Sequence, residues 1–187
     1  MMNAPDVALE SIIRAEEVEF TLDGKKITAF ADQTLIEIAK QQGIDIPHLC
    51  YKPGYRADGN CRACVVEIKG ERVLAPSCCR HPANGMEVTT NSPRAEASQR
   101  MVLELLISDA PLKDYKPGAN ELTMWAQKLS VTTSRFKPRL QPNADFSHPA
   151  MSVNLDACIQ CTRCVRACRE EQMNDVIGLA FRGDGAK

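Results

Sequence analysis

The pattern of apolar and polar residues over positions 18–42 predicts a strand hairpin followed by a short helix. Apolar side chains alternate with polar ones on both sides of Asp23 and Gly24, two residues that tolerate the positive φ angles of a tight hairpin turn. Residues 34–42 carry apolar side chains at helical spacing, with a threonine and a glutamate three positions apart at the start and Gly43 past the end. That arrangement is typical of a capped helix.

A second set of strands is expected after a long loop. Residues 47–60 are rich in glycine, proline and tyrosine, and the apolar runs that follow predict strands at 65–68, 72–74 and 87–89. A turn between the first two of these strands makes them a second hairpin. Strands and one helix in this order, within about eighty residues, indicate a small α+β domain.

Helical patterns follow in the second half of the chain. A helix is predicted over residues 92–108. Its apolar face is expected to carry Ala97, Met101, Leu105 and Leu106. The proline-rich connector 111–149 holds one predicted helix at 121–129. The apolar stripe of that helix is Leu122, Trp125, Ala126 and Leu129. We interpret Trp125 as a packing residue, and we expect the chain to become helical again within 158–173.

Charge and composition narrow the functional classes. The chain has 23 Lys and Arg against 24 Asp and Glu, a net charge of -1, so neither nucleic acid nor an anionic membrane surface is an expected partner. The first 17 residues have no apolar run long enough for a signal peptide or a membrane span, which predicts a cytoplasmic protein. Because the cytoplasm keeps thiols reduced, the nine cysteines indicate metal or cluster ligation rather than disulfides.

The first cysteine group predicts a 2Fe–2S site. Its members are Cys50, Cys61, Cys64 and Cys78. They leave gaps of 10, 2 and 13 residues, so that one close pair is completed by a cysteine on each side. A 2Fe–2S cluster needs four thiolates, held by a loop that glycines allow to curl around it. The alternative is a structural zinc site, which we disfavour because this group has one Cys-x-x-Cys knuckle and zinc sites usually have two. The three histidines are interpreted as hydrogen-bonded structural residues, namely His48, His81 and His148.

The loop around this group resembles that of a known family. Residues 46–51 and 59–64, which read IPHLCY and GNCRAC, are similar to the cluster loop of the large iron–sulfur subunit of respiratory NADH dehydrogenase. Relatives of that subunit occur in bidirectional hydrogenases and NAD-linked formate dehydrogenases. The resemblance implies a β-grasp fold. It also implies that Cys78 is the fourth ligand, because its spacing to 85–88 matches the family, and that Cys79 is a spare, buried thiol.

The second cysteine group carries the most specific signal in the chain. Its members are Cys158, Cys161, Cys164 and Cys168. They have the Cys-x2-Cys-x2-Cys-x3-Cys spacing of a 4Fe–4S ferredoxin motif, in which the fourth cysteine can ligate a second cluster. Cys168 is therefore assigned either to the same cluster or to a second one. No second copy of the motif occurs before Lys187, so we expect the chain to be part of a longer protein.

Arginines accompany both cysteine groups. Those near the first group are Arg56, Arg62 and Arg80, and those within the second are Arg163, Arg166 and Arg169. Positive charge close to a cluster favours its reduced form and raises its reduction potential. The second set is equally compatible with a solvated helix face.

The sequence around the second group indicates one branch of the family. Residues 148–161 and 165–178 closely resemble the large subunit of NAD-linked formate dehydrogenase. That family continues into a second cysteine motif and then into domains that hold a molybdenum or tungsten bis-molybdopterin guanine dinucleotide. NADH dehydrogenase places one histidine and three cysteines just after the helix that ends near residue 108, whereas residues 108–115 here have none. We therefore expect that histidine-ligated cluster to be absent.

The resemblance implies an electron-transfer module of an NAD-dependent formate dehydrogenase. Electrons from formate, oxidised at the pterin centre in the remaining catalytic domains, would pass through the clusters to flavin- and NAD-binding partner subunits. No catalytic residue is expected in this chain. The alternatives are the same relay role in an NAD-linked hydrogenase or NADH dehydrogenase and, from another class, a zinc-binding structural protein.

Four parts are expected along the chain. Residues 1–15 form a tail, and 16–92 form the β-grasp 2Fe–2S ferredoxin-like domain. A helical connector, 93–149, replaces the histidine-cysteine cluster region. Residues 150–187 are then part of a 4Fe–4S ferredoxin-like domain.

Overall fold

A computed structural model describes residues 16–110, 120–138, 143–155 and 158–186. The predicted tail, residues 1–15, lies outside these described residues. The expectation that the first 17 residues hold no signal peptide falls almost entirely on the same segment. Within the described ranges, no helix is both long enough and apolar enough to cross a membrane.

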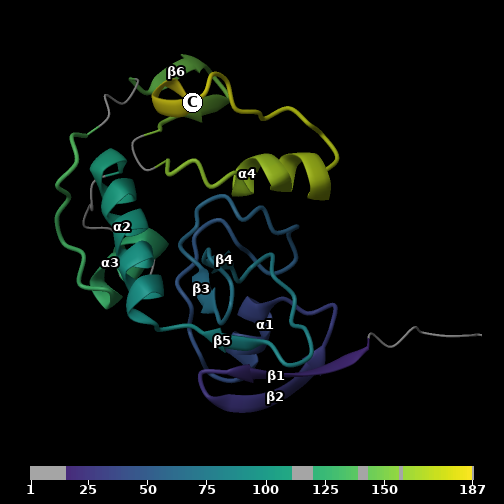
Figure 1. Cartoon of the computed structure of the whole chain (residues 1–187). Helices are drawn as coiled ribbons and strands as arrows, with labels where there is room; N and C mark the ends of the chain where they lie inside the picture. The colour runs from purple at the N-terminus through teal and green to yellow at the C-terminus, as the bar shows by residue number, and fades with distance from the viewer. Residues whose placement is uncertain (1–15, 111–119, 139–142, 156–157, 187) are drawn as a thin grey trace, which may run out of the picture.

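A five-stranded sheet and one helix form the N-terminal domain (Figure 1). The strands are β1 (Glu17–Leu22), β2 (Lys25–Phe30), β3 (Val65–Ile68), β4 (Ala75–Pro76) and β5 (Glu87–Thr89). Their order across the sheet is β2-β1-β5-β3-β4, with β1 and β5 parallel and the other neighbours antiparallel. The hairpin turn has φ 47° at Asp23 and 81° at Gly24, which confirms the predicted turn. The α+β prediction is therefore confirmed.

The helix α1 (Leu35–Gln41) is closed at both ends by the residues that the sequence indicated. The carboxylate of Glu37 accepts hydrogen bonds from the backbone N–H and the hydroxyl of Thr34, at 2.8 and 2.7 Å. Gly43 follows the helix at φ 75°, a conformation that glycine adopts without steric cost. Both ends of α1 thus carry the caps that the local sequence indicated, and at its start the N–H groups of Leu35 and Ile36 also donate to the carbonyls of Arg80 and Ser77.

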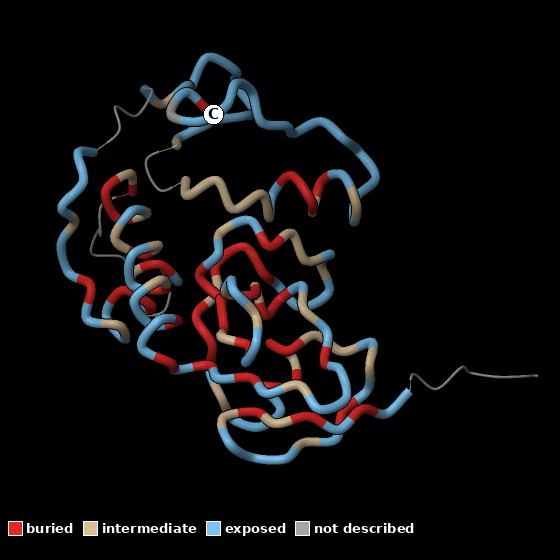
Figure 2. Tube along the Cα trace, in the orientation of Figure 1, coloured by how far each residue is buried: buried red, intermediate tan, exposed pale blue. Residues whose placement is uncertain are grey.

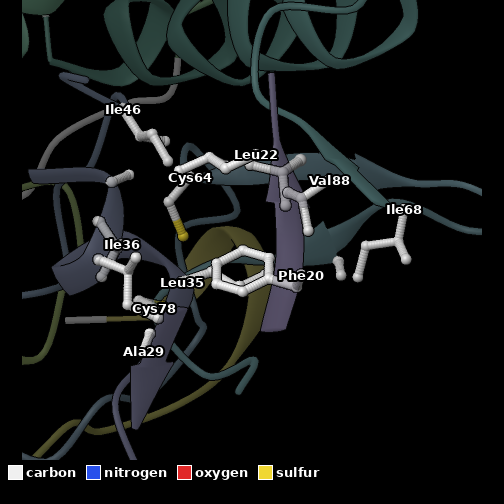
Figure 3. Packing of buried hydrophobic residues seen from close by; sticks show 14 of the residues in the cluster. Phe20, Leu22, Ala29, Leu35, Ile36, Ile46, Cys64, Ile68, Cys78 and Val88 are labelled. Carbon is white, nitrogen blue, oxygen red and sulfur yellow. The ribbon is translucent and has the colours of Figure 1, made fainter. Parts of the chain in front are cut away.

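The core of this domain lies between α1 and the sheet. Figure 3 shows Phe20 and Leu22 of β1 and Val88 of β5 facing Leu35 and Ile36 of α1. Two cysteines, Cys64 and Cys78, belong to the same buried cluster. Burial of these apolar side chains against one another is the main stabilising contribution, and it places part of the first cysteine group at the edge of a dry core.

The predicted strand at 72–74 is wrong. The register pairs Val65 with Pro76 and Val66 with Ala75, so the second strand of this hairpin comes three residues later and the connection is a longer loop. Val73 is 57% exposed in that loop. Its β-branched side chain suggested a strand, but the register is set by the strand pairing and not by that residue.

Two helices cover the side of the domain that carries the cysteine loop (Figure 1). They are α2 (Pro93–Asp109) and α3 (Glu121–Lys128), close to the predicted bounds. The stripe of α3 is confirmed, since Leu122, Trp125 and Ala126 are buried. These side chains pack in a second core cluster that includes Leu49 and Ala63, the neighbours of two cysteines. The helices therefore pack against the cysteine loop through Leu49 and Ala63.

The predicted apolar face of α2 is wrong at Ala97, Met101 and Leu105, which are exposed, and right at Leu106, which packs partly buried against the second core cluster. Its buried residues are Ala95, Gln99, Leu103, Ile107 and Ser108. Met101 and Leu105 are 39% and 45% exposed. Gln99 is buried because its amide donates a hydrogen bond to the carbonyl of Val65 at 2.9 Å, which satisfies a polar group that burial alone would penalise.

The C-terminal part has little regular structure. It contains the hairpin β6 (Asp145–His148) and β7 (Met151–Val153), the short helix α4 (Arg163–Arg166), a π-helical turn (Ala167–Glu171) and a 3-10 turn (Gly183–Gly185). The predicted helix at 158–173 is therefore confirmed only in its second half. Figures 1 and 2 show α4 lying across the cysteine loop of the N-terminal domain, with buried residues on both sides of the contact.

Candidate metal centre

Four cysteines from three segments meet above the sheet. Cys50 lies in the loop after α1, Cys61 and Cys64 flank the turn before β3, and Cys78 follows β4. The N–H of Cys50 lies 3.4 Å from the sulfur of Cys61, and the N–H of Cys61 lies 3.5 Å from the sulfur of Cys50. Thiol contacts also join Cys50 to Cys78 and Cys64 to Cys78. All four are free thiols, so the structure brings together the group that the spacing predicted.

Hydrogen bonds between the four cysteine side chains shift their pKa values. Hydrogen bonds from the Cys61 and Cys78 thiols lower the pKa of Cys50, and a hydrogen bond from Cys78 lowers the pKa of Cys64. The same contacts, together with burial, raise the pKa values of Cys61 and Cys78. A metal would take all four sulfurs as thiolates, so its binding would release the protons that they carry.

Backbone N–H groups also point at these sulfurs. The N–H groups of Asn60 and Cys61 face the sulfur of Cys50, that of Ala63 faces Cys61, and that of Cys78 faces Cys64. Such donors stabilise the negative charge that thiolate-ligated clusters carry. The loop can curl this tightly because Gly59 has φ +60°, and a Cβ atom there would lie 3.0 Å from the sulfur of Cys79.

The four cysteines match the donor set of a two-iron cluster in number and type. A 2Fe–2S core takes four thiolates and spreads them over two iron atoms. The N–H groups that face the sulfurs of Cys50, Cys61 and Cys64 would stabilise its negative charge.

Cys79 differs from its prediction. It is exposed, not buried, because it follows Cys78 directly and the turn directs the two side chains differently. Its sulfur still lies 3.6 Å from that of Cys78. Cys79 thus lies beside the site, next to Cys78.

The second cysteine group is not gathered in the same way. Cys158 and Cys161 are half-buried, Cys164 is exposed and Cys168 is buried. Thiol contacts join the four cysteines of the first group, whereas over the described residues no two sulfurs of the second group are hydrogen-bonded. The sulfur of Cys168 accepts the N–H of Val176 at 3.4 Å. Ligation of a 4Fe–4S cluster by this group stays a prediction.

The arginines of the second group divide into two kinds. Arg166 is 3% exposed, and Arg163 donates to the carbonyl of Tyr51 at 2.6 Å, so the solvated-face interpretation is wrong for both. Arg169 is exposed and pairs with Asp175 at 2.6 Å. The spacing of the three arginines does not distinguish them, because it does not show which of them contact the N-terminal domain.

The arginines near the first group are mostly neutralised by carboxylates. Arg56 pairs with Glu170 at 2.9 Å, and Arg80 pairs with Glu71. Arg62 is exposed. Their effect on a cluster is therefore smaller than the sequence suggested.

The three histidines make hydrogen bonds to backbone groups. A ring nitrogen of His48 lies 2.8 Å from the carbonyl of Ile46, and one of His81 lies 3.0 Å from the carbonyl of Gln33. His148 bonds the N–H of Ala150 in the β6-β7 turn. The expected absence of a histidine-ligated cluster concerns residues 108–115, of which those from 111 lie outside the described residues.

Sequence reasoning missed the contact between the two cysteine loops. The hydroxyl of Thr162 donates to the carboxylate of Asp58 at 2.7 Å, and the amide of Asn60 donates to the carbonyl of Gln160 at 3.2 Å. These partners are about a hundred residues apart in sequence. No local pattern relates residues at that separation, so the signal is visible only in the structure.

Comparison with known proteins gives a consistent family. Residues 15–93 match the model of the 2Fe-2S iron-sulfur cluster binding domain. The mitochondrial NADH-ubiquinone oxidoreductase 78 kDa subunit of Candida albicans is 34% identical over 181 residues, which cover 93% of this chain and 24% of that protein. The NADP-reducing hydrogenase subunit HndD of Solidesulfovibrio fructosivorans is 36% identical over 177 residues, covering 87% of this chain and 29% of that subunit. The chain thus spans less than a third of these curated relatives.

A solved structure extends the likeness to three dimensions. The crystal structure of NAD+-reducing NiFe hydrogenase in the H2-reduced state superimposes with a TM-score of 0.79 at 31% identity, covering 90% of this chain and 73% of that one. The chain therefore belongs to the iron–sulfur protein family that includes the 78 kDa subunit of NADH-ubiquinone oxidoreductase and this hydrogenase chain, and residues 15–93 are its 2Fe–2S cluster binding domain.

Proposed function

We propose that the chain is the electron-relay part of an oxidoreductase complex and that Cys50, Cys61, Cys64 and Cys78 hold its 2Fe–2S cluster. The observation that carries this proposal is the convergence of these four thiols, ringed by N–H donors. A bound 2Fe–2S cluster supplies a site that accepts and releases one electron at a time. The parallel pairing of β1 with β5 beside α1 supports the β-grasp assignment of the domain.

The chain's own residues would hold that site and exclude water from it. Cys50, Cys64 and Cys78 are buried. Leu49 and Ala63 pack against α2 and α3 behind the loop. Apolar packing on this side lowers the local dielectric and so strengthens the interaction of each N–H with a thiolate.

A second cluster near the first would make the chain a relay. We place it at Cys158, Cys161 and Cys164, with Cys168 closing the same cluster or a second one. The contacts of Asn60 with Gln160 and of Arg163 with Tyr51 support this placement, because they hold the two cysteine loops against each other. Closely spaced one-electron sites are what a relay needs.

The finer assignment is an NAD-dependent formate dehydrogenase. Residues 148–161 and 165–178 support it by their resemblance to that enzyme's large subunit. In this proposal a molybdenum or tungsten pterin centre lies in catalytic domains beyond this segment, and flavin- and NAD-binding subunits receive the electrons in the cytoplasm. The second candidate is the same relay in an NADH dehydrogenase or an NAD-linked hydrogenase, which the names of the matched relatives favour.

Two measurements separate these possibilities. Anaerobic purification with iron, zinc and acid-labile sulfide analysis tests the relay itself: we expect a coloured protein with iron and sulfide and a paramagnetic signal on reduction. A colourless protein with stoichiometric zinc would favour the zinc-binding alternative. The native complex is then assayed for NAD reduction with formate and with hydrogen. We expect NAD to be reduced with formate. If NAD is reduced with hydrogen and not with formate, the hydrogenase assignment replaces the formate dehydrogenase assignment.

A further inference from the structure

A buried arginine joins the two cysteine loops. The guanidinium of Arg166 donates through Nη2 to the carbonyl oxygen of Cys50, with the carbonyl of Cys161 3.4 Å from the same nitrogen. Its Nη1 donates to the carbonyl of Arg56. One side chain thus binds the backbone of a first-group cysteine and of a second-group cysteine that lie more than a hundred positions apart.

The guanidinium of Arg166 has one carboxylate neighbour among the described residues, Asp58, to which its Nε makes no hydrogen bond. Its Nε lies 3.6 Å from a carboxylate oxygen of Asp58 and is buried without a hydrogen-bond partner. That carboxylate is shared with Arg56, at 3.1 Å, and with Thr162, at 2.7 Å. Burying a cation without full compensation is unfavourable. Negative charge from a nearby cluster would supply what is missing.

We infer that Arg166 is a positioning residue that ties the Cys50 and Cys161 loops together and favours reduction of the 2Fe–2S cluster. The inference rests on the proposed function, because it needs a cluster at the first cysteine group. An oxidised 2Fe–2S core with four thiolates carries two negative charges, and reduction adds a third. A fixed positive charge on the backbone of a ligand stabilises the more negative state.

Substituting lysine for Arg166 separates the effect of its charge on the cluster from the effect of its hydrogen bonds on the loops. A lysine at position 166 keeps the positive charge, but a single ammonium cannot reproduce the planar fork that reaches several carbonyls. The Arg166→Lys variant should therefore keep a 2Fe–2S reduction potential close to that of the wild type. It should lose the hydrogen bonds that join the Cys50 and Cys161 loops. Arg166→Met should lose both. Arg169→Met removes the same charge from an exposed side chain paired with Asp175, and serves as the matched control.

The first test is a redox titration of the anaerobically purified full chain, followed by electron paramagnetic resonance. We expect Arg166→Met to shift the reduction equilibrium of the 2Fe–2S cluster about tenfold toward the oxidised form, which is about 59 mV for one electron. Arg166→Lys and Arg169→Met should shift it by less than about threefold. An Arg166→Met protein that retains the cluster at the wild-type potential overturns the electrostatic part.

The second test is amide hydrogen exchange over residues 50–62 and 158–166, which needs no activity and no measurement of potential. Exchange in Arg166→Lys should be about tenfold faster in both segments, while Arg169→Lys leaves it unchanged. Unchanged exchange in Arg166→Lys overturns the tie between loops, and this readout remains if Arg166→Met fails to fold. Failure of the proposed function is distinguishable, because the wild-type chain would then lack a 2Fe–2S signal before any variant is compared.

Discussion

Replacing Gly59 by alanine tests how tightly the cysteine loop is curled. Gly59 has φ +60°, and a Cβ atom there would lie 3.0 Å from the sulfur of Cys79 and 3.8 Å from the ring of Pro76. Gly54, in the same loop, has φ +88° but nothing within 4 Å of the corresponding position. Both glycines have positive φ and they differ in the crowding, so Gly54→Ala is the matched control.

The expected magnitudes follow from these two contributions. Alanine in the left-handed conformation costs about 1–2 kcal/mol at either position. At Gly59 the sulfur of Cys79 must also shift from its preferred rotamer, which adds about 0.5–1.5 kcal/mol. Removing that sulfur with Cys79→Ala should recover the second contribution in the Gly59→Ala background and leave Gly54→Ala unaffected. Cys79→Ala alone should change stability by less than about 0.5 kcal/mol, because the side chain is exposed.

Urea unfolding under anaerobic, reducing conditions measures the free energy of unfolding of each variant. A double-mutant cycle between positions 59 and 79 then isolates the coupling, since only contacting residues depart from additivity. If Gly59→Ala and Gly54→Ala cost the same and the cycle shows no coupling, the tight approach of Gly59 to Cys79 is wrong.

Two further predictions concern the surroundings of the site. Leu49→Ala should destabilise the fold by about 2–5 kcal/mol and speed the bleaching of the cluster in air, because Leu49 fills the second core cluster behind the cysteine loop. Val73→Ala, at an exposed side chain, should cost less than about 0.5 kcal/mol, and equal losses at the two positions would contradict the packing. Burial raises the pKa of Glu37, but hydrogen bonds from Thr34 and Tyr51 outweigh it and lower that pKa overall. The carboxylate therefore contributes stability above its unfolded pKa of about 4.3, and that contribution is lost as the pH falls through the lower folded value. The urea-unfolding difference between wild type and Glu37→Gln should be present at about pH 7 and shrink as the pH falls below the unfolded pKa of about 4.3, and a difference independent of pH would contradict this origin.

The elements set by local sequence could be predicted, and those set by distant contacts could not. The hairpin at Asp23-Gly24 and the cap of α1 depend on residues within four positions of one another. The buried stripe of α2 depends on Gln99, whose amide is satisfied by a carbonyl in β3. A hydropathy pattern assigns such a residue to the surface and rotates the predicted face away from the core.

The candidate site divides in the same way. Cysteine spacing identified Cys50, Cys61 and Cys64, the family resemblance selected Cys78 over Cys79, and the structure brings the four thiols together. The burial of Arg166 and the exposure of Cys79 could not be read from spacing. Both depend on how a turn or a distant segment is oriented, which the order of residues within a motif does not specify.

The central claim is that four particular thiolates hold a 2Fe–2S cluster, and two adjacent cysteines give its most direct test. Cys78→Ala and Cys79→Ala remove sulfur atoms 3.6 Å apart, so they differ in little except which thiol is lost. Electron paramagnetic resonance of the reduced, anaerobically purified chain should show the wild-type 2Fe–2S signal in Cys79→Ala and its loss in Cys78→Ala. Survival of the unchanged signal in Cys78→Ala, or its loss in Cys79→Ala, would contradict the ligand assignment.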